Sequence, residues 1–165
     1  ARDAIRRAPD HNTAEWSPWL GQPLLGQWVR DLRTLLDQLG TEPVTVVGDG
    51  PAGVVALCAA ALDERIAHTV TVGSLASYIS DVPYTNQRLG LMAPNMLREV
   101  GDIPHLATLI APRRLTISGA VHGNGNVLTA EELKANFKFT RRFYQGDSFI
   151  ALPDGDAKAI LRILK

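Results

Sequence analysis

The chain has 165 residues, of which 45% are hydrophobic, and this is enough to form the core of one domain. Its 17 basic residues balance 17 acidic ones, so no net field attracts nucleic acid or an anionic membrane. The longest apolar stretch, residues 54–62, is far shorter than the roughly 20 residues that span a bilayer. We therefore expect a soluble protein with no nucleic-acid or membrane partner.

The first half of the chain alternates between helix-type and strand-type segments. Apolar residues at spacings of three and four predict an amphipathic helix at 24–39. A short apolar run predicts a strand at 44–47, and a segment rich in Ala and Val predicts a buried helix at 51–62. A second strand, apolar on consecutive positions as in a parallel sheet, is expected at 68–72.

The second half resumes this alternation after an excursion at about 75–112. Four prolines must divide the excursion into short helices and turns. A third strand is expected at 115–118, followed by a helix at 129–144 that begins with a capping box. A weaker strand at 148–152 and a helix at 155–165 come next.

Strands and helices in this order predict an α/β fold. We expect a doubly wound, mostly parallel sheet with helices on both faces, which is a three-layer αβα arrangement, and one domain over residues 1–165. The first residues, ARDAIRR, include neither an initiator Met nor an apolar signal sequence. From them we expect the start to be a processing site or a cut within a longer polypeptide.

Cysteine and histidine usage gives no sign of metal or redox chemistry. The single cysteine, Cys58, excludes an internal disulfide and leaves the cellular compartment open. We interpret it as a small core residue. His11, His68 and His105 are dispersed and lack the spacing of metal ligands, so we expect no metal site.

Three glycines, Gly48, Gly50 and Gly53, follow the first strand in the spacing G-x-G-x-x-G. In a dinucleotide-binding turn, an acidic residue about 20 positions later binds the ribose. Here the second strand ends in TVTVGS without a carboxylate, and Asp63 and Glu64 precede that strand. Binding of FAD or NAD is therefore the less favoured alternative, and we expect no cofactor.

The same turn aligns with the nucleophile elbow, G-x-S-x-G, of α/β-hydrolases. Aligning GDGPA to this pattern places Gly48 first, Asp49 second and Gly50 at the nucleophile. Gly50 has no side chain and cannot form an acyl-enzyme. Pro51 follows the nucleophile position and has no N–H to donate to an oxyanion.

Three stretches of the chain resemble one hydrolase family. They are WLGQPLLGQWVRDLRTLLDQL, VGDGPAGVVALCAAALDERIAHTVTVGSLASY and DIPHLATLIAPRRLTISG. They are similar to the C-terminal half of α/β-hydrolases of the acetylxylan-esterase-like group, which includes degenerate domains with G-x-G-P-A-G at the elbow. The resemblance extends over about residues 19–164.

This resemblance implies a hydrolase sheet whose first strands are missing here, so the domain would be incomplete at its N-terminal side. The excursion would then be a lid-like insert. The family also implies a periplasmic or extracellular location, although the residues themselves leave the compartment unknown.

Carried over to this sequence, the family's triad positions are all replaced. The order is serine, acid, histidine, each at the end of a strand. The acid position falls in AVHGNGN, where His122 and Asn124 are the nearest polar residues, and the histidine position in LPDGDAK holds Asp154 and Asp156. The resemblance therefore implies a non-catalytic companion domain of a larger hydrolase, paired with an upstream hydrolase segment or domain and able to bind carbohydrate.

The main alternative is an active ester hydrolase that uses unorthodox residues or residues supplied by missing segments. Asp49 could act as a nucleophile or base, although capping of the following helix explains it more simply. His122 could act as a general base, although a hydrogen-bonded loop histidine is commoner. Ser74 and Ser77 follow a strand, but they lack the elbow context and are interpreted as loop-capping residues. A pure interaction scaffold is a further alternative.

Overall fold

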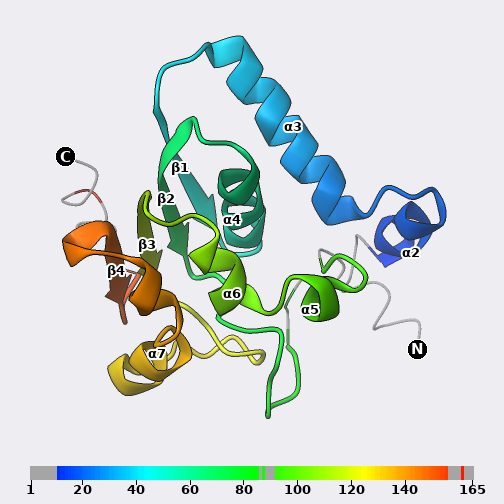
Figure 1. Cartoon of the computed structure of the whole chain (residues 1–165). Coiled ribbons are helices and arrows are strands. Elements are labelled where there is room, and N and C mark those ends of the chain that lie inside the picture. The colour runs from blue at the N-terminus through cyan, green and yellow to red at the C-terminus, as the bar shows by residue number, and fades with distance from the viewer. Residues whose placement is uncertain (1–10, 86, 88–91, 156–160, 162–165) are drawn as a thin grey trace.

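The computed structural model describes residues 11–85, 87, 92–155 and 161. Within them, four parallel strands form one sheet in the order β1-β2-β3-β4 (Figure 1). The strands are β1 (Val44–Asp49), β2 (Ile66–Val72), β3 (Arg114–Ser118) and β4 (Phe149–Leu152). The expected α/β fold with a parallel sheet is therefore confirmed, and each strand lies within two residues of its predicted bounds.

Helices occupy most of the segments between the strands. The α-helices are α2 (His11–Trp19), α3 (Leu24–Leu39), α4 (Ala52–Leu62), α5 (Met96–Glu99), α6 (Ile103–Thr108) and α7 (Ala130–Asn136). Two 3₁₀-helices, η2 (Thr140–Phe143) and η3 (Gly146–Ser148), lead into β4. The sequence prediction missed α2. The helix predicted at 155–165 falls mostly outside the described residues.

The helix predicted at 129–144 is shorter than expected. Its capping box is present at Thr129 and Glu132, but α7 ends at Asn136 and the chain continues into η2. The hydroxyl of Thr140, which is fully buried, donates to the carbonyl of Pro104 at 2.7 Å. This tertiary bond fixes η2 against α6.

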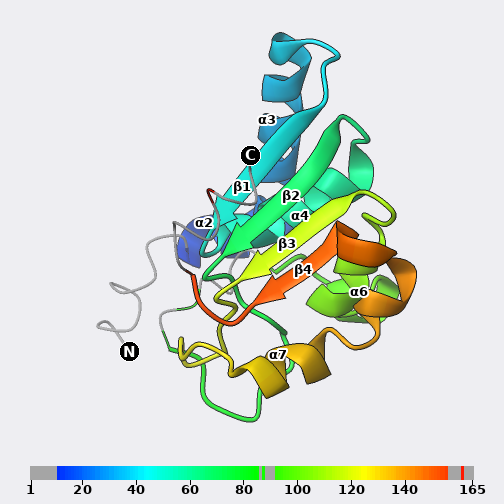
Figure 2. The same ribbon diagram turned by 90° about the vertical axis from the view of Figure 1, so that its left-hand side faces the viewer.

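The described helices between the strands pack against one face of the sheet, and in Figure 2 α4 and α6 lie behind the strands while α7 lies below their C-terminal ends. On that face, Val46, Thr69, Leu115 and Phe149 stand side by side across the four strands. Helix α4 lies between β1 and β2 on one side and α3 and α6 on the other. Because α4 is covered in this way, its sequence is apolar nearly all round, as expected.

The opposite face carries no described helix. Thr45, His68 and Arg114 form one row across it, and Val47 remains 50% exposed. The Nε2 atom of His68 lies 3.0 Å from the hydroxyl of Thr116. Burial, together with the charge of Arg114, lowers the pKa of His68. The helix predicted at 155–165, which would contribute to a second helical layer, falls mostly outside the described residues.

The excursion forms one wall of the C-terminal side of the sheet, and Asp102 holds it in place. The buried carboxylate of Asp102 caps α6 by accepting from the Ile103 amide at 2.8 Å. The same carboxylate accepts from the Tyr78 amide at 2.7 Å and from the Ser77 hydroxyl. Residues 77 and 78 are thereby fixed to the start of α6.

Arg113 joins α4, the following turn and the start of β2. Its guanidinium donates to the carbonyls of Ala60 (2.5 Å), Asp63 (3.0 Å) and Ile66 (2.8 Å). The carbonyls at the end of a helix have no partner within the helix, so Arg113 supplies one from outside.

The neighbouring Asp63 carboxylate, which is 6% exposed, pairs with Arg65 and Arg33. Hydrogen bonds from Arg65 hold the pKa of Asp63 well below its usual range.

We predict that Arg113→Met lowers the free energy of unfolding by about 2–3 kcal/mol, because three backbone carbonyls lose a charged donor. Arg114→Met is the matched control, since this exposed neighbour removes the same charge and should change stability by less than about 0.5 kcal/mol. Urea unfolding followed by circular dichroism measures both variants. An equal loss of unfolding free energy in the two variants would show that the three hydrogen bonds of Arg113 do not stabilise the fold.

Candidate functional site

The turn between β1 and α4 lies at the C-terminal edge of the sheet, where α/β folds place their ligands. Gly50 stands at its bend with a φ of +52°, between the last residue of β1 and Pro51. A positive φ at the middle of a sharp strand-to-helix turn agrees with the elbow interpretation. A Cβ at Gly50 would meet no atom within 4 Å, so the position opens into free space.

The other two glycines of the motif allow α4 to approach the sheet closely. A Cβ at Gly48 would stand 2.5 Å from the carbonyl oxygen of Ala52, and a Cβ at Gly53 would stand 1.8 Å from the hydroxyl of Ser74. No side chain fits at either position. Helix packing therefore accounts for Gly48 and Gly53 without a bound phosphate.

Backbone and side-chain bonds from the end of β2 hold the bend in place. The amide of Gly50 donates to the carbonyl of Val72 at 2.7 Å, and the buried hydroxyl of Ser74 donates to the carbonyl of Gly50 at 2.7 Å. The hydroxyl of Ser74 is thus engaged with the backbone of the turn. This is the bonding role expected of it from the sequence.

Asp49 does not cap α4, and the expectation that it does is wrong. Helix α4 begins after Pro51 with no side-chain hydrogen bond at its cap, while Asp49 is the exposed last residue of β1. Side chains alternate between the two faces of a strand, and Gly48 faces α4. Asp49 therefore points to the opposite face, away from the helix that it was expected to cap.

At the acid position, the loop after β3 brings His122 against α7. The Nε2 atom of His122 lies 3.4 Å from Oε1 of Glu132. The other oxygen, Oε2, accepts from the amide (2.8 Å) and the hydroxyl (2.9 Å) of Thr129. These bonds, first those from Thr129 and then that from His122, lower the pKa of Glu132. Asn124 accepts from the Asn126 amide at 3.0 Å and so shapes the loop.

His122 and Asn124 line a cavity of about 730 Å³. Other polar residues on its wall are Ser77, Ser80, Asp81, Glu132 and Asn136. Gly123 lies so near Ser80 that a Cβ there would stand 2.7 Å from the Ser80 hydroxyl. The residues that line this cavity include neither Gly50 nor Asp154. The structure thus brings together the two candidates at the acid position, but not those at the other positions of the triad.

At the histidine position, Asp154 is exposed and its backbone is what contacts the sheet. The carbonyl of Asp154 accepts from the buried hydroxyl of Ser118 at 2.7 Å. Next to it, a Cβ at Gly119 would stand 2.9 Å from the Gly155 nitrogen. These contacts fix the chain after β4 beside the end of β3. The second candidate, Asp156, lies outside the described residues.

Sequence reasoning missed the contribution of Glu132 and Ser80 to the cavity. The sequence pattern identifies Glu132 only as the last residue of the capping box at the start of the helix predicted at 129–144, and that box is present. A carboxylate that caps a helix through one oxygen has a second oxygen free to bind another group. This second oxygen of Glu132 is the one sequence signal that indicates a further partner. Ser80 gave no signal, because its place beside Gly123 depends on how the excursion folds.

Other site types have no support in the described part of the chain. Over residues 11–85, 87, 92–155 and 161, no group of three or more His, Cys, Asp or Glu side chains could hold a metal ion. In the same part, no helix combines the length and the apolar character needed to cross a bilayer. Burial raises the pKa of Cys58 to about 12, so its thiol stays protonated at neutral pH.

Comparison with protein families, with curated proteins and with solved structures gave no match for this chain. The structure by itself therefore establishes a parallel four-strand α/β domain. Any assignment to a family has to be argued from the turn and from the cavity.

We predict that Gly53→Ala lowers the free energy of unfolding by about 2–4 kcal/mol, because the new methyl group would overlap Ser74. The matched control is Gly26→Ala in α3, where a Cβ meets no atom within 4 Å. That variant should be unchanged or about 0.5–1 kcal/mol more stable.

The double variant Gly53→Ala, Ser74→Gly removes the overlapping side chain. Its loss of stability should be smaller than the sum of the two single losses, as measured by a double-mutant cycle in urea. Strict additivity would contradict the contact between helix and turn.

Proposed function

We propose that this chain is an esterase-like α/β-hydrolase domain, equivalent to the C-terminal half of that fold, and that it serves a larger hydrolase as a non-catalytic companion. The observation that carries the proposal is the bend at Gly50. Its backbone has the positive φ of an elbow turn, but the nucleophile position has no side chain.

The chemistry of acyl transfer explains why we propose a non-catalytic role for this domain. An acyl-enzyme needs an oxygen or sulfur nucleophile, and Gly50 offers none. Pro51 removes the backbone N–H that would stabilise the oxyanion. Asp154, at the histidine position, does not line the cavity that contains His122. Loss of one triad member already costs several orders of magnitude in rate.

The companion role is supported by the free edge of β1. Among the described residues, β1 is an outer strand and pairs only with β2. The amides of Val44 and Gly50 donate toward β2, to the carbonyls of Arg65 and Val72. Successive residues of a parallel strand direct their backbone groups to alternate sides. Thr45, Val47 and Asp49 therefore present theirs to the free edge, where the strands of a catalytic half would join.

We predict that the amides of Thr45, Val47 and Asp49 exchange with solvent much faster than those of Val46 and Gly48 when the chain is studied by hydrogen exchange. The two sets lie in one strand and differ only in the side to which they point. Adding the catalytic segment should protect the three edge amides. Protection of all five in the chain alone would mean that the edge is already covered, and the companion role would then lose its support.

A second candidate function, an ester hydrolase with an unorthodox base, is favoured by the pairing of His122 and Glu132. Thr129 fixes the Glu132 carboxylate, which in turn lies 3.4 Å from the imidazole. A base held by an orienting carboxylate at the wall of a large cavity is an arrangement that hydrolases use. Ser80 is the hydroxyl on the same wall that lies beside Gly123.

One assay tests both candidates. We predict that the chain hydrolyses 4-nitrophenyl acetate no faster than its Asp49→Asn and His122→Gln variants, because no residue acts as a catalyst. Turnover that disappears in Asp49→Asn would overturn the proposal. Turnover that is lost in both His122→Gln and Glu132→Gln would establish the second candidate instead. Glu132→Gln is the sharper control, since glutamine can retain the capping box while it removes the charge that orients His122.

A further inference from the structure

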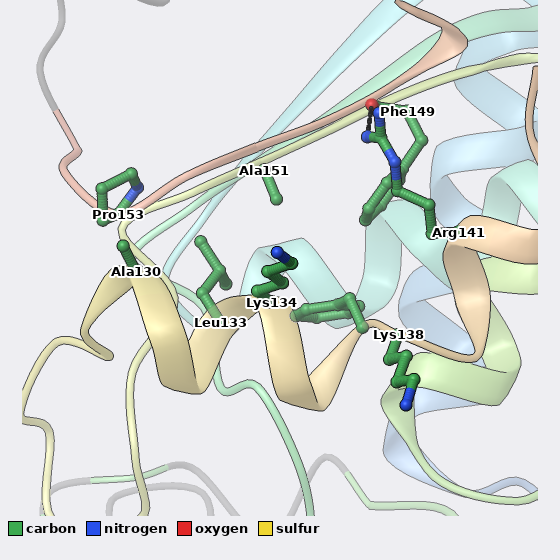
Figure 3. Close-up of a pocket in the computed structure, with 9 residues that line it drawn as sticks. Ala130, Leu133, Lys134, Lys138, Arg141, Phe149, Ala151 and Pro153 are labelled. Atoms are coloured by element: carbon green, nitrogen blue, oxygen red, sulfur yellow. Dashed lines mark hydrogen bonds between the residues drawn. The ribbon is translucent and has the colours of Figure 1, made fainter. Parts of the chain in front are cut away.

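A separate cavity of about 540 Å³ lies between α7 and β4 (Figure 3). Nine residues line it: Ala130, Leu133, Lys134, Phe137, Lys138, Arg141, Phe149, Ala151 and Pro153. Its floor is apolar, because Leu133, Phe137 and Phe149 are buried members of the core. A cavity of this size with an apolar floor is typical of small-ligand sites when a few polar groups converge on it.

The polar side chains that line this cavity are all cationic. Three of the nine lining residues are Lys or Arg and none is acidic, although the whole chain has 17 residues of each charge. In Figure 3 the ammonium group of Lys134 points into the space between α7 and β4, whereas that of Lys138 points away from the strand. The site therefore combines an apolar surface with a local positive charge.

Arg141 has a different role at the same cavity. Its Nη1 atom donates to the carbonyl of Phe149 at 2.8 Å, and its guanidinium carbon lies 5.9 Å from the centre of the Phe149 ring. This carbonyl is on the outer side of β4, and Arg141 occupies it. An extended peptide that paired with β4 would have to displace Arg141, so the structure favours a small ligand over an added strand.

The backbone of β4 offers one further donor. The carbonyl of Leu152 accepts from the Gly119 amide and so points toward β3. Because adjacent residues of a parallel strand direct their backbone groups to opposite sides, the N–H of Ala151 points to the outer side. Ala151 also lines the cavity. Among the described residues this outward N–H has no strand partner, so it is a second donor in addition to the ammonium of Lys134.

We propose that this cavity binds a small amphiphilic anion, namely a carboxylate on a single aliphatic chain. The carboxylate lies at Lys134 and the N–H of Ala151, and the aliphatic chain lies against Ala130, Leu133 and Pro153, which line the same side of the cavity. Charge complementarity selects the anionic head, and the apolar floor selects the tail. The site is distinct from the turn at Gly50 and from the cavity at His122, and it does not depend on the function proposed above.

The test is titration of the full chain with decanoate, followed by calorimetry and by the amide spectrum in NMR. We expect saturable binding, with the largest shifts at Ala151 and Lys134 and none at Gly50. Acetate lacks the tail and decyltrimethylammonium reverses the charge of the head, so both should bind at least about tenfold more weakly than decanoate.

Matched variants then locate the head group. Lys134→Gln should weaken decanoate binding by about tenfold, because it removes a charged donor. Lys138→Gln makes the same change in the turn after α7, where the ammonium points away from the strand, and should weaken binding by less than about threefold. Both side chains are exposed, so both variants should fold like the parent chain.

Three results would overturn the proposal. The first is no saturable binding of decanoate below the concentration at which it forms micelles. The second is equal binding of decyltrimethylammonium, which would show that charge selects nothing. The third is an equal loss of decanoate affinity in Lys134→Gln and Lys138→Gln, which would show that only the net charge of the protein matters.

Discussion

The close approach of α4 to the sheet is the constraint on which the rest of the structure depends. Gly48 and Gly53 have no room for a Cβ, since the nearest atoms would lie 2.5 and 1.8 Å away. This contact places the start of α4 directly on the ends of β1 and β2. From there α4 forms the centre of the core, with α3 and α6 packed against it. Arg113 fixes its other end.

The sequence was a good guide wherever local pattern and tertiary contacts agree. Periodic spacing predicted the apolar stripe of α3 and the apolar faces of α4, and steric reasoning applied to the glycines of the turn. The alternation of strands and helices predicted the parallel sheet. Prediction failed where a distant contact decided the outcome. After α7, the hydroxyl of Thr140 holds η2 to the carbonyl of Pro104 in α6. The pairing of His122 with Glu132 depends on how the loop after β3 meets α7.

The two cavities differ in the chemistry that they offer. The one beside His122 has hydroxyl, amide, imidazole and carboxylate groups among its apolar lining residues, whereas the polar side chains that line the one beside Lys134 are all cationic. Both are bordered by α7, whose opposite sides face them. A short helix with a complete capping box thus separates the cavity with several kinds of polar group, the polar region, from the one whose polar side chains are only cationic. Glu132, through its two oxygens, secures the helix and reaches into the polar region.

The open space around Gly50 has a consequence for how such a domain can change. Gly48 and Gly53 are confined by packing, but a Cβ added at Gly50 would meet no atom within 4 Å. Substitution there meets only the modest conformational penalty of a left-handed backbone. A side chain could therefore be introduced at this one position while the layers beneath stay where they are.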